Sequence, residues 1–122
     1  MSELVKQHIE TIEAGYEFLL AYAAQGRIDE DRSHPGPYAS DTLEAMQAAL
    51  GGLKSALEPN ADPFHAVLHH DIDKALALIG FVLNSPPLSS EAVDNLNVSI
   101  HLRTVLTDVF VLSGRLGNED EG

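Results

Sequence analysis

Apolar residues recur every three or four positions along most of this chain, and prolines or glycines interrupt the pattern at three places. A spacing of three and four places side chains on one face of an α-helix, whereas a strand requires strict alternation. No stretch combines alternation with the tight turn of a β-hairpin. The sequence therefore predicts an all-α fold.

The three interruptions divide the chain into four amphipathic segments. The predicted helices cover about Glu3–Gln25, Asp41–Leu57, Pro63–Leu83 and Ser90–Leu116. Asp62 before Pro63 is typical of a helix start, because the carboxylate caps free amides and proline fits the first helical position. We expect an antiparallel four-helix bundle with one long loop, Arg27–Ser40, between the first two helices. Residues 1–117 are expected to form this single domain, and residues 118–122 an acidic disordered tail.

Composition narrows the classes of partner. The 122 residues carry 19 acidic and 7 basic side chains, a net charge of −12, which repels nucleic-acid backbones and anionic membranes. The absence of cysteine excludes disulfides and thiolate metal sites. The N-terminus lacks a signal-peptide pattern, and no apolar run reaches the length of a membrane span. We expect a cytoplasmic protein that binds neither nucleic acid nor membrane.

The last segment has more apolar surface than one bundle core requires. One side of it carries Val98, Leu102, Val105, Val109, Leu112 and Leu116, and other sides carry Leu96, Ile100, Leu106 and Phe110. Either this helix is central in the bundle, or its second face is buried in a homodimer. We expect the homodimer.

Histidines give the sequence its one indication of chemistry. His65 and His69 are four residues apart, a spacing that places two imidazoles on one side of a helix, where they can bind one metal ion. Antiparallel pairing would bring Asp108 to the height of His65, and would place His8 at the same end of the bundle. The predicted metal site is therefore His8, His65, His69 and Asp108, with Glu58 as a further ligand, and it suits iron, manganese or zinc. The alternative is that these imidazoles are ordinary core-edge side chains satisfied by a carboxylate or a carbonyl group.

The pair His65 and His69, with His101 and the later Asp108, resembles in part the hemerythrin family, whose helical bundles hold two irons. The resemblance covers only these four positions. That family supplies a histidine and a glutamate from its second helix, where this chain offers only leucine, methionine and alanine. We therefore do not expect an oxygen-binding di-iron centre.

Two further features could bind a ligand or a partner. A polar stripe on the last segment either lines a small pocket or is the solvated face of that helix; it consists of Asp94, Asn97, His101, Thr104 and Asp108. The long loop, which contains Tyr38 and two proline-flanked turns, is a candidate surface for a partner. There is no phosphate-binding glycine loop and no nucleophile motif.

These features predict a small acidic accessory or regulatory protein that is not an enzyme. We expect it to form a homodimer and to act by contacting another protein, which the sequence does not identify. The alternative hypothesis is a metal-binding bundle that uses the histidine and aspartate cluster. A weaker alternative is a mimic of nucleic acid that uses the negative charge, although solubility alone would explain acids spread over all the helices.

Overall fold

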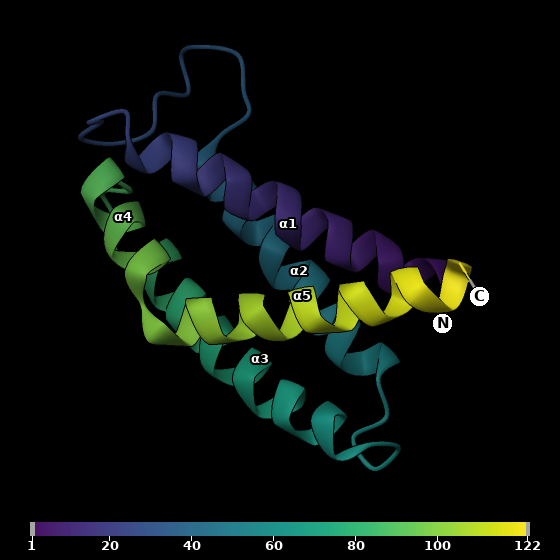
Figure 1. Ribbon diagram of the computed structural model, residues 1–122. Coiled ribbons are helices and arrows are strands. Elements are labelled where there is room, and N and C mark those ends of the chain that lie inside the picture. Colours follow the sequence, from purple (N-terminus) through teal and green to yellow (C-terminus); the bar gives the residue numbers. More distant parts are fainter. Residues whose placement is uncertain (1, 122) are drawn as a thin grey trace.

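The computed structural model describes residues 2–121, with side chains described through Gly114, and the described chain contains helices and no strands (Figure 1). The expectation of an all-α fold is thus confirmed. The helices are α1 (Glu3–Ala23), α2 (Ala39–Ala56), α3 (Pro63–Leu83), α4 (Ser90–Val98) and α5 (Ile100–Glu121). The predicted boundary between a domain and an acidic tail falls where side chains lie outside the described residues, and it stays a prediction.

The expectation of four helices is corrected to five, because the last predicted segment is broken at Ser99. This residue has an extended backbone (φ −62°, ψ 133°) and ends α4, and its Oγ accepts a hydrogen bond from the amide of His101 at 3.3 Å. No proline or glycine marks the break, so the apolar spacing continues across it in the sequence. Ser99 acts as a cap for α5, and the two helices meet at 62°.

In the described part of the chain, no single helix has both the length and the apolarity needed to cross a membrane. Only the bent pair of α4 with the first part of α5 reaches that length and composition together.

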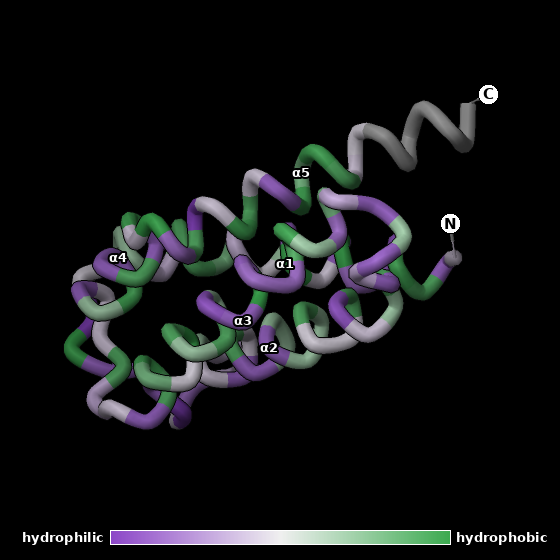
Figure 2. The backbone as a smooth tube through the Cα atoms, turned by 90° about the horizontal axis from the view of Figure 1, so that it is seen from below, coloured by the Kyte–Doolittle hydropathy of each residue, from purple (hydrophilic) through white to green (hydrophobic). Residues whose placement is uncertain are grey.

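The four long helices pack as a ring around one core. α1 lies against α2, α2 against α3, α3 against α5, and α5 against α1, while α4 packs mainly on α1. Figure 1 shows α5 crossing in front of α2 and α3, and Figure 2 shows it at the edge of the molecule when viewed from below. One long side of α5 therefore remains without a helical neighbour.

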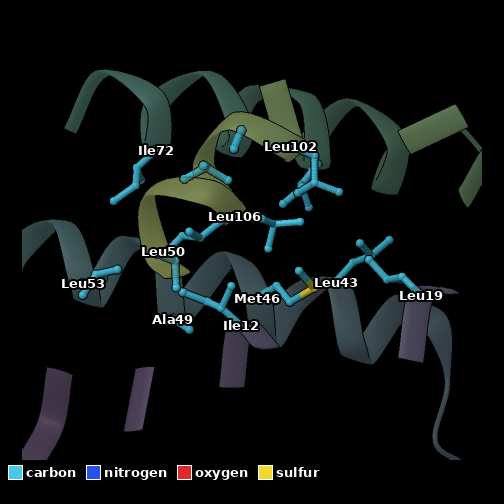
Figure 3. Close-up of a cluster of buried hydrophobic side chains, with 14 of the residues drawn as sticks. Ile12, Leu19, Leu43, Met46, Ala49, Leu50, Leu53, Ile72, Leu102 and Leu106 are labelled. Atoms are coloured by element: carbon cyan, nitrogen blue, oxygen red, sulfur yellow. The ribbon is translucent and has the colours of Figure 1, made fainter. Parts of the chain in front are cut away.

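The core takes one face from every helix. Figure 3 shows leucines of α2 and α5 pointing toward one another between the surrounding helices. The fully buried side chains of the core include Ile12, Leu19, Leu43, Met46, Leu50, Leu53, Leu68, Ile72, Ile79, Leu96 and Leu102. Leu96, Leu102 and Leu106 are all buried within this single copy. Of the additional apolar residues that the sequence indicated, Leu96 and Leu106 are thus covered by the fold itself, while Ile100 and Phe110 remain exposed.

Hydrogen bonds connect the end of α1 and the start of the long loop to the turn between α3 and α4. The hydroxyl of Tyr22 donates to the carbonyl of Leu88 at 2.6 Å, and the hydroxyl of Ser90 donates to the carbonyl of Tyr22 at 2.7 Å. The backbone amide of Ser90 also donates to the carbonyl of Arg27 at 2.9 Å. Burial raises the pKa of Tyr22, and the nearby carboxylates of Glu30 and Asp29 add to the increase.

Replacing Tyr22 with phenylalanine is expected to destabilise the fold by about 1 kcal/mol, because the buried carbonyl of Leu88 loses its donor. Urea unfolding followed by circular dichroism measures the change. Tyr38→Phe is the matched control, since the hydroxyl of Tyr38 bonds only to carbonyls of its own exposed loop. Equal midpoints for Tyr22→Phe and wild type would show that the connection between loop and turn adds no stability.

Candidate functional site on helix α5

The outward side of α5 carries a stripe of uncharged residues. Ile100, Thr104, Thr107 and Val111 follow one another at intervals of four, three and four, so they share one face of the helix. All four are exposed, Ile100 by 71% and Val111 by 60%. We call these four residues the outer stripe. It presents two aliphatic side chains and two threonines to solvent in a protein of charge −12.

The exposed faces of the other long helices carry acidic side chains. Glu10 and Glu17 are exposed on α1, Glu44 is exposed on α2, and Asp73 is exposed on α3. On α3, the exposed side chains of Val67 and Phe81 are separated along the helix by the exposed charges of Asp73 and Lys74. The outer stripe differs from these charged faces, although α1 carries another exposed stripe without a charge, formed by Leu4, Gln7, Thr11, Ala14 and Ala21.

Two hollows flank the bend between α4 and α5. The stripe hollow has a volume of about 440 Å³ and lies on the outer stripe itself; it is lined by Val98, Ile100, Arg103, Thr104, Thr107 and Asp108. The α1 hollow has a volume of about 330 Å³ and lies between α1, α4 and α5; it is lined by Tyr16, Leu20, Ala23, Ala24, Asp94, Asn97, Val98 and Arg103. Val98 and Arg103 line both, because the bend turns their side chains to the surface between the hollows.

A pair of carboxyl groups joins α3 to α5 at the edge of the stripe hollow. Burial, together with the hydrogen bond and the charge of the adjacent Asp71 carboxyl on α3, raises the pKa of Asp108 to about 7. The Oδ2 atom of Asp108 has no hydrogen-bond partner among the described residues. The pair is therefore most stable when it holds one proton.

Replacing Asp108 with asparagine is expected to raise stability at pH 8 and to change it little near pH 4.5. The pKa in the folded state is above the ordinary value of 3.8, so the native protein binds the proton more tightly and loses stability as the pH rises from about 4 to about 7. Solvent screening at this partly exposed site limits the increase in the free energy of unfolding of Asp108→Asn at pH 8 to about 1 kcal/mol. Urea midpoints at the two pH values measure it, with Glu44→Gln as the control for removing a negative charge. An equal effect of Asp108→Asn at both pH values would contradict the shared proton.

The four residues of the predicted metal site make separate contacts. The ring of His65 places Nδ1 3.1 Å from the carbonyl oxygen of Glu58, and the ring of His69 places Nε2 2.6 Å from the carbonyl oxygen of Leu57. The ring of His8 packs directly on Gly52, where a Cβ atom would overlap it. In residues 2–114, no three His, Asp or Glu side chains lie together in a way that could hold a metal ion.

The two histidines of α3 do lie on one side of that helix, as their spacing predicts. They reach the carbonyl oxygens of Leu57 and Glu58, the two residues that follow α2, and the carbonyl of Glu58 also accepts from the amide of Ala61 at 3.1 Å. Glu58 takes part through its backbone and not through its carboxylate. The structure therefore places these imidazoles against the segment that follows α2, and Asp108 meets Asp71 instead of a histidine.

The bend divides the predicted polar stripe. Asp94 and Asn97 line the α1 hollow, Thr104 and Asp108 line the stripe hollow, and His101 is exposed. Arg103 lines both hollows. Its role could have been found from the sequence only by placing a helix break at Ser99.

Comparison of the chain with known protein families, with curated protein sequences and with solved structures finds no match in any of them.

Proposed function

We propose that this protein is a non-enzymatic accessory or regulatory protein that acts through protein contacts, and that two copies associate through the outer stripe of α5. The observation that carries the proposal is the uncharged, partly aliphatic stripe on the helix that has one side without a neighbour. Burying exposed aliphatic side chains against a second copy is favourable, and the four residues of the stripe carry no charge, while Arg103 and Asp108 line the hollow beside them.

The order of residues along the stripe favours a second copy of this chain. Ile100 and Val111 lie at equal distances on either side of the midpoint between Val105 and Leu106, and so do Thr104 and Thr107. In an antiparallel pair related by a two-fold axis at that midpoint, Ile100 of each copy faces Val111 of the other, and threonine faces threonine. Aliphatic groups thus meet aliphatic groups, and hydroxyls meet hydroxyls.

Shape supports the same arrangement. The stripe hollow is lined by three residues of the stripe, Ile100, Thr104 and Thr107, while Phe110 and Val111 are exposed beyond its lining. The two-fold axis brings these two side chains of each copy to the hollow of the other. A protrusion and a hollow on one helix, exchanged by symmetry, are what a self-complementary interface requires.

Charge determines how strong such a pair can be. Two chains that each have a net charge of −12 repel each other, and salt screens that repulsion over about 8 Å at physiological ionic strength. The stripe from Ile100 to Val111 is about 17 Å long, which gives an interface below the standard size. We therefore expect a dimer with a dissociation constant on the order of micromolar that becomes tighter as salt is added.

Sedimentation equilibrium at several protein and salt concentrations tests the proposal. The expected mass is that of the 13.1 kDa monomer at low concentration, and twice that mass at high concentration, with the transition moving to lower protein concentration in added salt. A mass of one chain under all of these conditions would rule out the homodimer.

A further inference from the structure

The α1 hollow contains a buried amide with an unused acceptor. The side chain of Asn97 is almost fully buried, with 6% of the residue exposed, and its Nδ2 atom donates to the carbonyl of Leu19 at 3.1 Å. The Oδ1 atom has no partner among the described residues. This oxygen is itself closed to solvent, so it is an unpaired polar atom beneath the hollow and not a contact for a molecule in it.

Two opposite charges line the same hollow without pairing. Arg103 of α5 and Asp94 of α4 are both exposed, and in the described part of the chain neither forms an ion pair. The bend at Ser99 holds them on different helices at either side of the hollow. Arg103 is suited to a carboxylate, and Asp94 is suited to an ammonium group.

The remaining lining is apolar or amphipathic. Leu20, Ala23 and Val98 supply aliphatic surface, and Tyr16 supplies a ring with a hydroxyl group. The volume of about 330 Å³ is at the small end of ligand sites. A molecule with a net negative charge would be repelled by a chain of −12, whereas a zwitterion carries both charges without that penalty.

We propose that the hollow between α1, α4 and α5 binds a small zwitterion with an apolar side chain, of the class of free aliphatic α-amino acids. The carboxylate pairs with Arg103, the ammonium group is bound by Asp94, and the side chain lies on Leu20 and Val98. This site lies beside the outer stripe and does not depend on dimer formation.

Isothermal titration calorimetry with L-leucine tests the site, with 4-methylpentanoate and 3-methylbutylamine as analogues that lack the amino or the carboxyl group. L-leucine is expected to bind, and each analogue is expected to bind at least tenfold more weakly. Arg103→Gln and Asp94→Asn are each expected to weaken the binding of L-leucine at least tenfold, because each substitution removes the partner of one charge on the ligand. Both positions are exposed, so circular dichroism should show unchanged helix content.

Lys74→Gln and Glu44→Gln are the matched controls, since they remove one charge of each sign from exposed positions outside the hollow. They should leave the affinity for L-leucine unchanged. No heat of binding up to 10 mM L-leucine would overturn the proposal, and so would equal binding of L-leucine and its two analogues. Unchanged affinity in both Arg103→Gln and Asp94→Asn would also overturn it.

Discussion

Replacing Ile100 and Val111 together with glutamate is expected to keep the protein monomeric at every concentration at which the wild type dimerises. In the antiparallel arrangement each introduced carboxylate faces another across the two-fold axis, and both aliphatic contacts are lost. Like charges opposed in an interface cost several kcal/mol, which exceeds what a micromolar dimer of this size can absorb. The substituted side chains are exposed by 71% and 60%, so the monomer should keep its fold. Sedimentation equilibrium measures the mass, and thermal unfolding checks the fold.

The control is the pair Val67→Glu and Phe81→Glu on α3, which adds the same charge at exposed apolar positions outside the stripe. This variant is expected to dimerise nearly as well as the wild type, with a small loss from the added net charge. If the stripe variant dimerised and the α3 variant did not, self-association would use another face.

A charge exchange separates the antiparallel register from other ways of covering the stripe. A chain carrying Ile100→Lys with Val111→Glu would place its introduced lysine opposite the introduced glutamate of the second copy at both ends of the stripe. Dimer formation should then recover relative to the double glutamate variant, and added salt should weaken it, contrary to its effect on the wild type. A parallel pair would instead oppose like charges and stay monomeric.

Replacing Leu50 with alanine is expected to destabilise the protein by about 3 kcal/mol, a large effect for a single core substitution. Leu50 of α2 is fully buried and points toward the α5 side of the core (Figure 3). Truncation removes its apolar contacts and leaves a cavity that rigid helices on each side cannot close. A decrease in Tm on the order of 10 °C should accompany the loss.

Two further variants show whether this loss comes from packing. Leu50→Met keeps most of the volume and should cost less than about 1.5 kcal/mol. Ile28→Ala removes an aliphatic side chain that is 84% exposed, and it should change stability very little. A loss below about 1 kcal/mol for Leu50→Ala would mean that the core around this residue collapses to fill the space.

Local signals in the sequence determined most helix boundaries. Asp62 caps the helix that begins at Pro63, with its side chain accepting a hydrogen bond from the amide of Phe64, and the same helix ends at Leu83 as the spacing predicts. The first two helices also lie close to their expected ranges. Capping side chains, proline and glycine act within a few residues, so these boundaries can be read without knowledge of the rest of the fold.

The candidate sites depended on contacts that a single sequence does not specify. The break at Ser99 has no proline or glycine, and the extended backbone there lets α4 pack mainly on α1 while α5 packs mainly on α3. That bend forms both hollows and brings Arg103 between them. A helical wheel that treats α4 and α5 as one continuous helix through Ser99 places the residues that line the hollows on the wrong faces.

The sequence by itself determined the helical class, the long loop and the side-by-side placement of His65 and His69. Only the tertiary structure decided what those imidazoles contact, because a neighbouring helix end supplies the carbonyl groups of Leu57 and Glu58. The tertiary structure likewise paired Asp108 with Asp71 and left the outer stripe of α5 uncovered. Periodicity fixes which residues share a face, but the partner of that face depends on the packing of segments far apart in the chain.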